Sequence, residues 1–88
     1  MSDTLEVLAL LSDSRPMLVG MKQVIKGLEN GRVDTVLLAS DADAFVARAV
    51  DEAAKKQGAV IYYVPSKAEL GRRAGIQVDA ACVGISGK

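Results

Sequence analysis

The sequence predicts an α/β domain in which helices cover both faces of a small, largely parallel or mixed sheet. Apolar runs of strand length alternate along the chain with segments whose apolar residues recur at helical spacing. One such run, residues 35–39, shows no polar alternation, which is typical of a strand buried on both faces. The 88 residues, 50% of them hydrophobic, suit one compact domain over residues 1–88 with little room for an enclosed cavity.

The first two expected elements are a helix and a strand. Residues 4–11 are mostly good helix formers, and Asp3 followed one turn later by Glu6 fits a capping box. The segment 15–19 has the composition of a short strand, with Pro16 near its beginning. A short helix and a short edge strand therefore open the fold.

Two longer helices are expected in the middle of the chain. Apolar residues at helical spacing predict a helix over 21–29, and Asn30-Gly31 is expected to end it. A second helix is predicted over 44–57, with Asp43 as its N-cap and Gly58 after its last turn. Its outer face carries acids and bases at i,i+4 spacing, to which we assign no function: Asp51/Lys55 and Glu52/Lys56.

The last third of the chain is expected to hold two strands and a helix. Residues 59–64 are mostly β-branched and aromatic and stop at Pro65, which predicts a strand. Ser66 and Glu69 at capping-box spacing mark the start of a helix. The remaining elements follow in order: the helix from Ser66 to about Ala74, a loop over 76–79 and a strand over 80–85.

The residue types that the chain lacks exclude several kinds of chemistry. With no His and one Cys, it has no Cys/His zinc site, Ser-His-Asp triad, Cys-His dyad or internal disulfide. Cys82 lies in an apolar run and is interpreted as a small buried side chain. No glycine-rich phosphate loop is present, which argues against a nucleotide-dependent enzyme, and we expect neither a cofactor nor a metal. No apolar stretch spans a bilayer and the N-terminus lacks a basic signal start, so we expect a cytoplasmic protein without a membrane partner.

The charges balance overall but not along the chain. Eleven Lys and Arg stand against eleven Asp and Glu, and a pI near 6.2 argues against indiscriminate binding to nucleic acid. Residues 1–44 carry an excess of acids, and residues 45–88 carry an excess of bases. The effect of these charges depends on where the fold places them.

Chemistry is expected at one edge of the sheet, where the carboxyl ends of parallel strands meet the N-termini of the following helices. Gly20 lets a ligand approach the backbone, and the free N–H groups of the first helical turn attract phosphate. Lys22 and Lys26 strengthen that attraction, and Gln23 offers a donor and an acceptor to a base edge. A solvated helix face after a glycine turn is the alternative. Three segments reach this edge: 20–23, 40–43 and 65–67.

Further residues near this edge have a structural and a functional interpretation. Asp41 and Asp43 could form an acid/base or Mg²⁺ pair, but turn formation and N-capping explain them without a third ligand. Gly71 destabilises its helix by about 1 kcal/mol relative to Ala. Either close packing of the helix on the sheet or close approach of a partner's backbone should offset this loss. Ile76 and Val78 could pack against a base or against the core.

Three motifs together resemble one family. They are residues 19–28 (VGMKQVIKGL), 38–43 (LASDAD) and 64–76 (VPSKAELGRRAGI). In this order and spacing they resemble the kink-turn RNA-binding ribosomal proteins of the L7Ae and L30e group, in particular its short bacterial members. The resemblance covers roughly residues 4–85. It implies a three-layer α-β-α sandwich with a small four-stranded mixed sheet, and no catalysis.

The resemblance also implies which RNA this fold clamps and which residues bind it. A kink-turn is a sharply bent duplex built on tandem sheared G·A pairs. The N–H of Gly20 would meet a phosphate at the kink, and Lys22 and Gln23 would face the guanines. Asp43 and Lys67 would adjoin the extruded nucleotide. The implied RNA-binding residues are Gly20, Met21, Lys22, Gln23, Lys26, Asp43, Lys67, Arg72 as a peripheral phosphate contact, and the base-covering loop Ile76, Gln77, Val78 and Asp79.

Two positions depart from the family pattern. Lys22-Gln23 stand where archaeal and eukaryotic members have Asn-Glu, and Ala44 replaces a usual proline. The resemblance nevertheless implies a monomeric protein that stabilises a kinked RNA, whether ribosomal RNA, a riboswitch or a small RNA–protein particle. Two alternatives stay open: an interaction module docking on protein or on RNA without a kink-turn, and a nucleotide-handling enzyme using Asp41 and Asp43.

Overall fold

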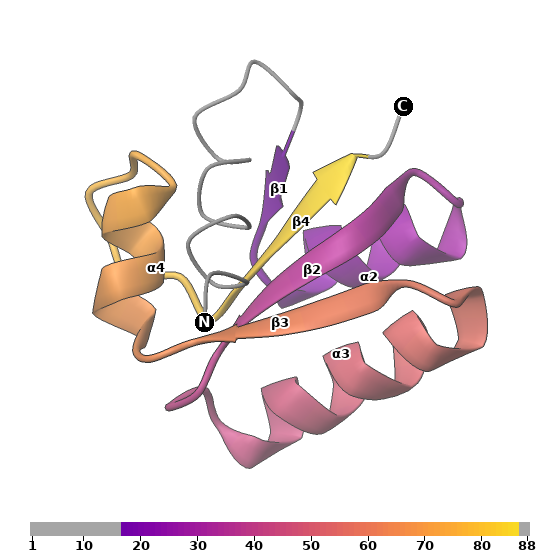
Figure 1. Cartoon of the computed structure of the whole chain (residues 1–88), viewed down its shortest axis with the longest axis horizontal. Helices are drawn as coiled ribbons and strands as arrows, with labels where there is room; N and C mark the ends of the chain where they lie inside the picture. The colour runs from indigo at the N-terminus through magenta and orange to yellow at the C-terminus, as the bar shows by residue number, and fades with distance from the viewer. Residues whose placement is uncertain (1–16, 87–88) are drawn as a thin grey trace.

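The computed structural model describes residues 17–86. The helix expected over residues 4–11 and the start of the strand expected over 15–19 lie outside the described residues. The elements in chain order are β1 (Met17–Val19), α2 (Met21–Glu29), β2 (Val33–Ala39), α3 (Ala44–Gln57), β3 (Val60–Val64), α4 (Lys67–Arg73) and β4 (Cys82–Ser86) (Figure 1).

The four strands form one mixed sheet in the order β1-β4-β2-β3. β4 pairs antiparallel with both β1 and β2, whereas β2 and β3 are parallel. β1, β2 and β3 therefore run in the same direction, and their carboxyl ends meet at one edge of the sheet. The predicted α/β class and the four-stranded mixed sheet are confirmed.

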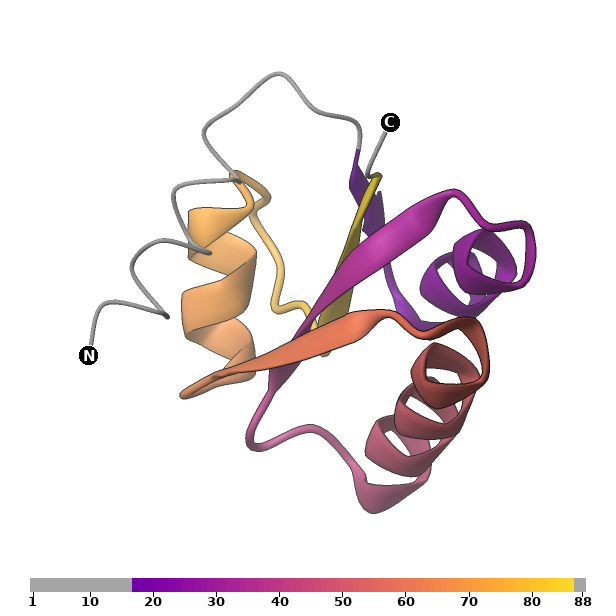
Figure 2. The same cartoon turned by 45° about the vertical axis from the view of Figure 1, so that its right-hand side comes forward.

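Helices cover both faces of this sheet, with α4 on one face and α2 and α3 on the other (Figure 2). Leu37 and Leu38, which are neighbours on β2, point to opposite faces and are both fully buried. This explains the lack of polar alternation in that strand. The core on the α4 face consists of Leu37, Ala39, Val64, Leu70, Ala74, Ala80, Val83 and Ile85. The core on the α2/α3 face consists of Val24, Leu28, Val33, Val36, Leu38, Val50, Ala54 and Cys82.

Local signals account for most element boundaries. α2 and α3 span the residues expected for them, and Gly58 ends α3 in the left-handed region at φ 70° and ψ 22°. β2 begins earlier than expected, at Val33, because Val33 pairs with Ser86 of β4. β4 begins later than expected, because the N–H of Ala80 donates to the carbonyl oxygen of Lys67 instead of to a strand.

Two expected helix caps differ from the structure. Asp43 occupies the N-cap position of α3, but its side chain makes no capping hydrogen bond. In α4, the N–H of Glu69 donates to Ser66 Oγ at 3.1 Å, as a capping box requires. The Glu69 carboxylate, however, accepts from Arg72 and Arg73, which lie on the same helix face. Only half of the expected capping box forms.

Candidate functional site

The segments expected at the functional edge do meet there. Gly20 follows β1, Ser40 follows β2 and Pro65 follows β3, and these three strands end on the same side of the sheet. Main-chain hydrogen bonds connect the ends of the strands. The N–H of Ala39 donates to the carbonyl oxygen of Ala81 at 2.8 Å, and that of Ser40 donates to the carbonyl oxygen of Val64 at 2.7 Å. The edge is therefore one connected surface.

Gly20 starts α2 in a backbone conformation of φ 98° and ψ 153°, which is accessible essentially only to glycine. Its N–H donates to the carbonyl oxygen of Cys82 at 3.1 Å. This donor is therefore already used within the sheet edge, and the expectation that it meets a phosphate stays a prediction. The N–H groups of Met21, Lys22 and Gln23 have no acceptor in a regular helix, and Gly20 at the N-cap position has no side chain to supply one.

The side chains of α2 divide between core and solvent. Met21 is half-buried and packs against the core of the α2/α3 face, so its side chain supports the helix. Lys22, Gln23 and Lys26 are exposed. The helical period that buries one face of α2 thus presents two cations and an amide to solvent at the edge.

Gln23 and Lys26 also line a hollow of about 150 Å³ beside α2. Asn30 and Arg32 contribute to the same hollow and were missed by the sequence reasoning, which treated the residues after α2 only as a helix stop. The chain turns at Gly31, and the N–H of Arg32 donates back to the carbonyl oxygen of Gly27 at 2.9 Å. The sequence did contain a signal for Arg32 as a site residue, since it is a cation that directly follows the glycine at the end of α2.

The two aspartates of the edge differ in their partners. Asp41 Oδ1 accepts the backbone N–H of Lys67 at 2.8 Å, so this carboxylate caps α4 from a different loop. The Asp43 carboxylate is exposed and accepts no hydrogen bond from residues 17–86. Within that same range, no three Asp, Glu or Cys side chains gather as metal ligands, and no helix is long and apolar enough to cross a bilayer.

Gly71 explains how the loop over 76–79 is placed. A Cβ on Gly71 would lie 2.2 Å from the carbonyl oxygen of Val78, and the N–H of Ile76 donates to the carbonyl oxygen of Gly71 at 3.1 Å. The backbone that Gly71 accommodates thus belongs to the chain's own loop, and not to the sheet or to a partner, which were the two explanations expected from the sequence. The loop packs directly on α4.

The four loop side chains are not equivalent. Ile76 is half-buried and packs against the core of the α4 face, whereas Val78 is 69% exposed. Gln77 and Asp79 are exposed. Val78 is therefore the apolar loop side chain that is free to contact a ligand.

Two ionisable groups near the site have altered pKa values. Hydrogen bonds from Arg73 and then Arg72 hold the pKa of Glu69 below its ordinary value. Arg72, expected as a phosphate contact, is thus ion-paired on its own helix. Burial raises the pKa of the Cys82 thiol to about 11, which fits the interpretation of Cys82 as a buried side chain and not a nucleophile.

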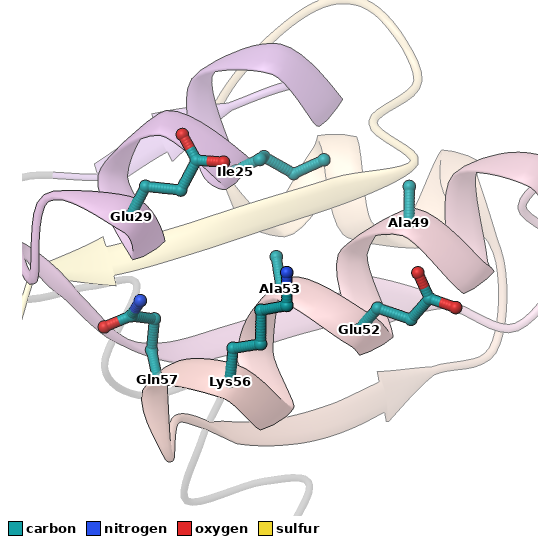
Figure 3. Close-up of a pocket in the computed structure, with 7 residues that line it drawn as sticks. All are labelled: Ile25, Glu29, Ala49, Glu52, Ala53, Lys56 and Gln57. Atoms are coloured by element: carbon teal, nitrogen blue, oxygen red, sulfur yellow. The ribbon is translucent and has the colours of Figure 1, made fainter.

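A larger hollow, of about 210 Å³, lies between α2 and α3, and none of the expected site residues lines it. Figure 3 shows Ile25 and Glu29 on α2 facing Ala49, Glu52 and Ala53 on α3. This volume is below that of a usual small-molecule pocket. Lys55 and Asp51 of α3 form the expected ion pair at 3.1 Å. Glu52 and Lys56, expected on the outer face of α3, instead line the hollow between α2 and α3, and no ion pair joins them in the described part of the chain.

Comparison of sequences identifies relatives. The profile described as the ribosomal protein L7Ae/L30e/S12e/Gadd45 family matches residues 2–88. An RNA-binding protein of Bacillus pumilus is 35% identical over 75 residues, which are 85% of this chain and 92% of that protein. An RNA-binding protein of Caldanaerobacter subterraneus is 41% identical over 63 residues, 72% of this chain and 77% of the relative. The RNA-binding protein YbxF of Geobacillus stearothermophilus is 36% identical over 69 residues, 78% and 84% of the two chains.

Solved structures share the fold. A protein of unknown function from Bacillus halodurans superposes with a TM-score of 0.82 at 27% identity, over 98% of this chain and 86% of that one. The Giardia lamblia 15.5kD RNA binding protein superposes with a TM-score of 0.85 at 24% identity, over 97% and 74% of the two chains. At that identity, the second likeness concerns the fold alone.

Proposed function

The chain belongs to the ribosomal protein L7Ae/L30e/S12e/Gadd45 family, and on that premise we propose that it is a non-catalytic RNA-binding protein that recognises and stabilises kink-turns. The bacterial relatives named above as RNA-binding proteins support the ligand class. The observation that carries the proposal is the connected edge, where the uncapped first turn of α2 lies beside exposed Lys22, Gln23 and Lys26.

Each part of this edge suits a different part of a bent RNA. The free N–H groups of the first turn of α2 bind a phosphate, a role that Gly20 supports through its backbone conformation. Lys22 and Gln23 provide donors and an acceptor to base edges. Lys26 and Arg32 both line the hollow beside α2, where their positive charges would contact the RNA backbone.

The other half of the edge receives the extruded nucleotide. Exposed Val78 covers a base, while Lys67 and the exposed carboxylate of Asp43 offer it polar contacts. Because the strand ends are joined by main-chain bonds, the site is preformed, and it stabilises the kinked RNA by binding that conformation preferentially. A formal net charge of zero limits binding to RNA of any other shape.

The test compares a duplex carrying a kink-turn with a duplex in which Watson–Crick pairs replace the G·A pairs. Lys22→Ala and Gln23→Ala should each weaken binding to the kink-turn by roughly tenfold, the weight of one good base contact. Both side chains are exposed, so the fold should persist in both variants. Lys56→Ala is the matched control: Lys56 is an exposed cation in the last turn of α3, lines the hollow between α2 and α3 and not the edge, and its variant should bind like the wild type.

Equal affinity of the wild-type protein for the two duplexes would contradict the proposal. The family name makes ribosomal RNA the first natural target to examine, with riboswitches as the second. A steep loss of affinity with salt is expected in either case, because cations on the edge replace counterions on the phosphates.

A further inference from the structure

We propose that Asp41 is a positioning residue for RNA binding: its carboxylate fixes the start of α4 and thereby holds the Lys67 side chain at the edge. The inference rests on the proposed function. Its basis is the hydrogen bond of 2.8 Å from the backbone N–H of Lys67 to Asp41 Oδ1, between residues that lie 26 positions apart.

The turn that carries Asp41 is firmly attached to the sheet. The N–H of Ser40 donates to the carbonyl oxygen of Val64 at 2.7 Å, and that of Ala42 donates to the carbonyl oxygen of Ala39 at 3.1 Å. Ala42 also packs against the cores on both faces of the sheet. Asp41 thus projects from a fixed point, and a different residue, Asp43, occupies the N-cap position of the following helix.

Lys67 is held through its main chain on both sides. Its N–H, the first of α4, has no acceptor within a helix, and the Asp41 carboxylate supplies one. The negative charge of Asp41 also interacts favourably with the helix dipole at the N-terminus of α4. The carbonyl oxygen of Lys67 accepts the N–H of Ala80 at 3.1 Å, which joins Lys67 to the end of the loop that carries Val78.

This arrangement leaves only the Lys67 side chain to be ordered when RNA binds. A lysine on a fixed backbone loses less conformational entropy on binding than one on a mobile helix end. Without the Asp41 carboxylate, the first turn of α4 loses its anchor to the β2–α3 turn. The Lys67 contact should then weaken although neither Lys67 nor the RNA has changed.

A double-mutant cycle tests this coupling by measuring affinity for the kink-turn duplex. Lys67→Ala should lower affinity about tenfold, the weight of one charge-assisted contact, and Asp41→Ala should cause most of the same loss. The double variant should bind only slightly more weakly than either single variant, because both remove one contact. Asp41→Asn keeps an acceptor oxygen and should recover most of the affinity.

The matched control pairs Asp41→Ala with Lys26→Ala, whose side chain lies on α2. Those two losses should be additive, because the residues share no partner. Asp41→Glu, which keeps the charge but moves the acceptor, provides a second variant if Asp41→Ala does not fold, and should also bind more weakly than the wild type. The folded fraction of every variant is checked by urea denaturation.

The outcomes separate the inference from the proposed function. Additive losses for Asp41→Ala and Lys67→Ala, or wild-type affinity for Asp41→Ala, in a protein that still prefers the kink-turn would overturn the inference alone. A wild-type protein without that preference would overturn the proposed function and the inference with it. Non-additive losses with recovery by Asp41→Asn support the positioning role, which a general loss of stability does not reproduce.

Discussion

The carbonyl oxygen of Val78 occupies the space in which a side chain on Gly71 would begin. A Cβ on Gly71 would lie 2.2 Å from that oxygen, 3.1 Å from the carbonyl carbon of Val78 and 3.2 Å from the Cα of Asp79. All three atoms belong to the backbone, so no change of side-chain rotamer relieves the contact. The loop that follows α4 can dock on the helix in this way only because residue 71 is glycine.

Gly71→Ala is therefore expected to lower the free energy of unfolding by about 1–3 kcal/mol, as overpacking does. The loss should appear although alanine favours a helix by about 1 kcal/mol over glycine. Urea denaturation measures it. Gly27→Ala is the matched control in α2, where the new Cβ would meet the side-chain atoms Leu18 Cδ1 at 2.6 Å and Val33 Cγ2 at 2.7 Å.

Side-chain atoms can move more easily than a backbone carbonyl, so Gly27→Ala should cost less than Gly71→Ala. A Gly71→Ala variant as stable as the wild type would show that the loop can leave α4 without cost. Gly71→Ala should also weaken binding to the kink-turn duplex, because the loop that it displaces from α4 carries Val78.

The sequence predicted the elements whose signals are local. α2 ends near a glycine turn and α3 ends at Gly58, and their apolar residues recur at helical spacing, so both were placed at their observed bounds. The edge that gathers the site was also predictable, because the direction of β1, β2 and β3 follows from the alternation of strands and helices.

Contacts between residues far apart in the chain were not predictable in this way. Nothing in the spacing of Asp41 and Lys67 indicates their hydrogen bond, and nothing near Gly20 indicates that its N–H is taken by Cys82. The resemblance to a family supplied a set of residues, but it could not say which donors the fold itself consumes. Arg32 is a different case: the turn at Gly31 brings it to the hollow, and this local signal was available in the sequence but overlooked.

The ion pairs of Glu69 predict a change of stability with pH. Arg73 and Arg72 hold the pKa of Glu69 below its ordinary value. A lowered carboxyl pKa means that the pairing stabilises the folded state above the unfolded pKa, and that the contribution is lost as the pH falls through the folded pKa. Glu69→Gln should thus lower the Tm at pH 7, and its difference from the wild type should shrink as the pH falls below the ordinary carboxyl pKa and vanish below the folded pKa of Glu69.

Thermal unfolding at pH 7 and pH 3 measures this difference. Glu52→Gln is the control, because the Glu52 carboxylate is exposed and forms no ion pair among residues 17–86. Its Tm should follow the wild type at both pH values. A Glu69→Gln deficit that persists unchanged at pH 3 would show that the glutamate stabilises α4 by some means other than its charge.

Cys82 should be inert in the folded protein. Its side chain is fully buried, and burial raises the pKa of the thiol to about 11. Because the thiolate is the reactive form, its fraction near pH 7.5 falls by roughly two orders of magnitude relative to a free cysteine. A thiol-labelling reagent should react slowly with the native protein and rapidly in urea. Fast labelling of the native protein would contradict the buried placement.

Gly20 and Gly58 allow backbone conformation to be tested by itself, because a Cβ at either position would meet nothing within 4 Å. Gly58 has φ 70° and ψ 22°, the left-handed region that costs an L residue about 1–2 kcal/mol. Gly20 has φ 98° and ψ 153°, a region that other residues essentially never adopt. Gly20→Ala should therefore lower the free energy of unfolding more than Gly58→Ala.

Because Gly20 also directs the first turn of α2, its substitution should weaken kink-turn binding. Gly58→Ala, at the opposite end of α3 from the edge, should leave the affinity unchanged. Paired urea and RNA-binding titrations measure both effects, and equal losses of affinity in the two variants would show that the start of α2 has no special part in binding.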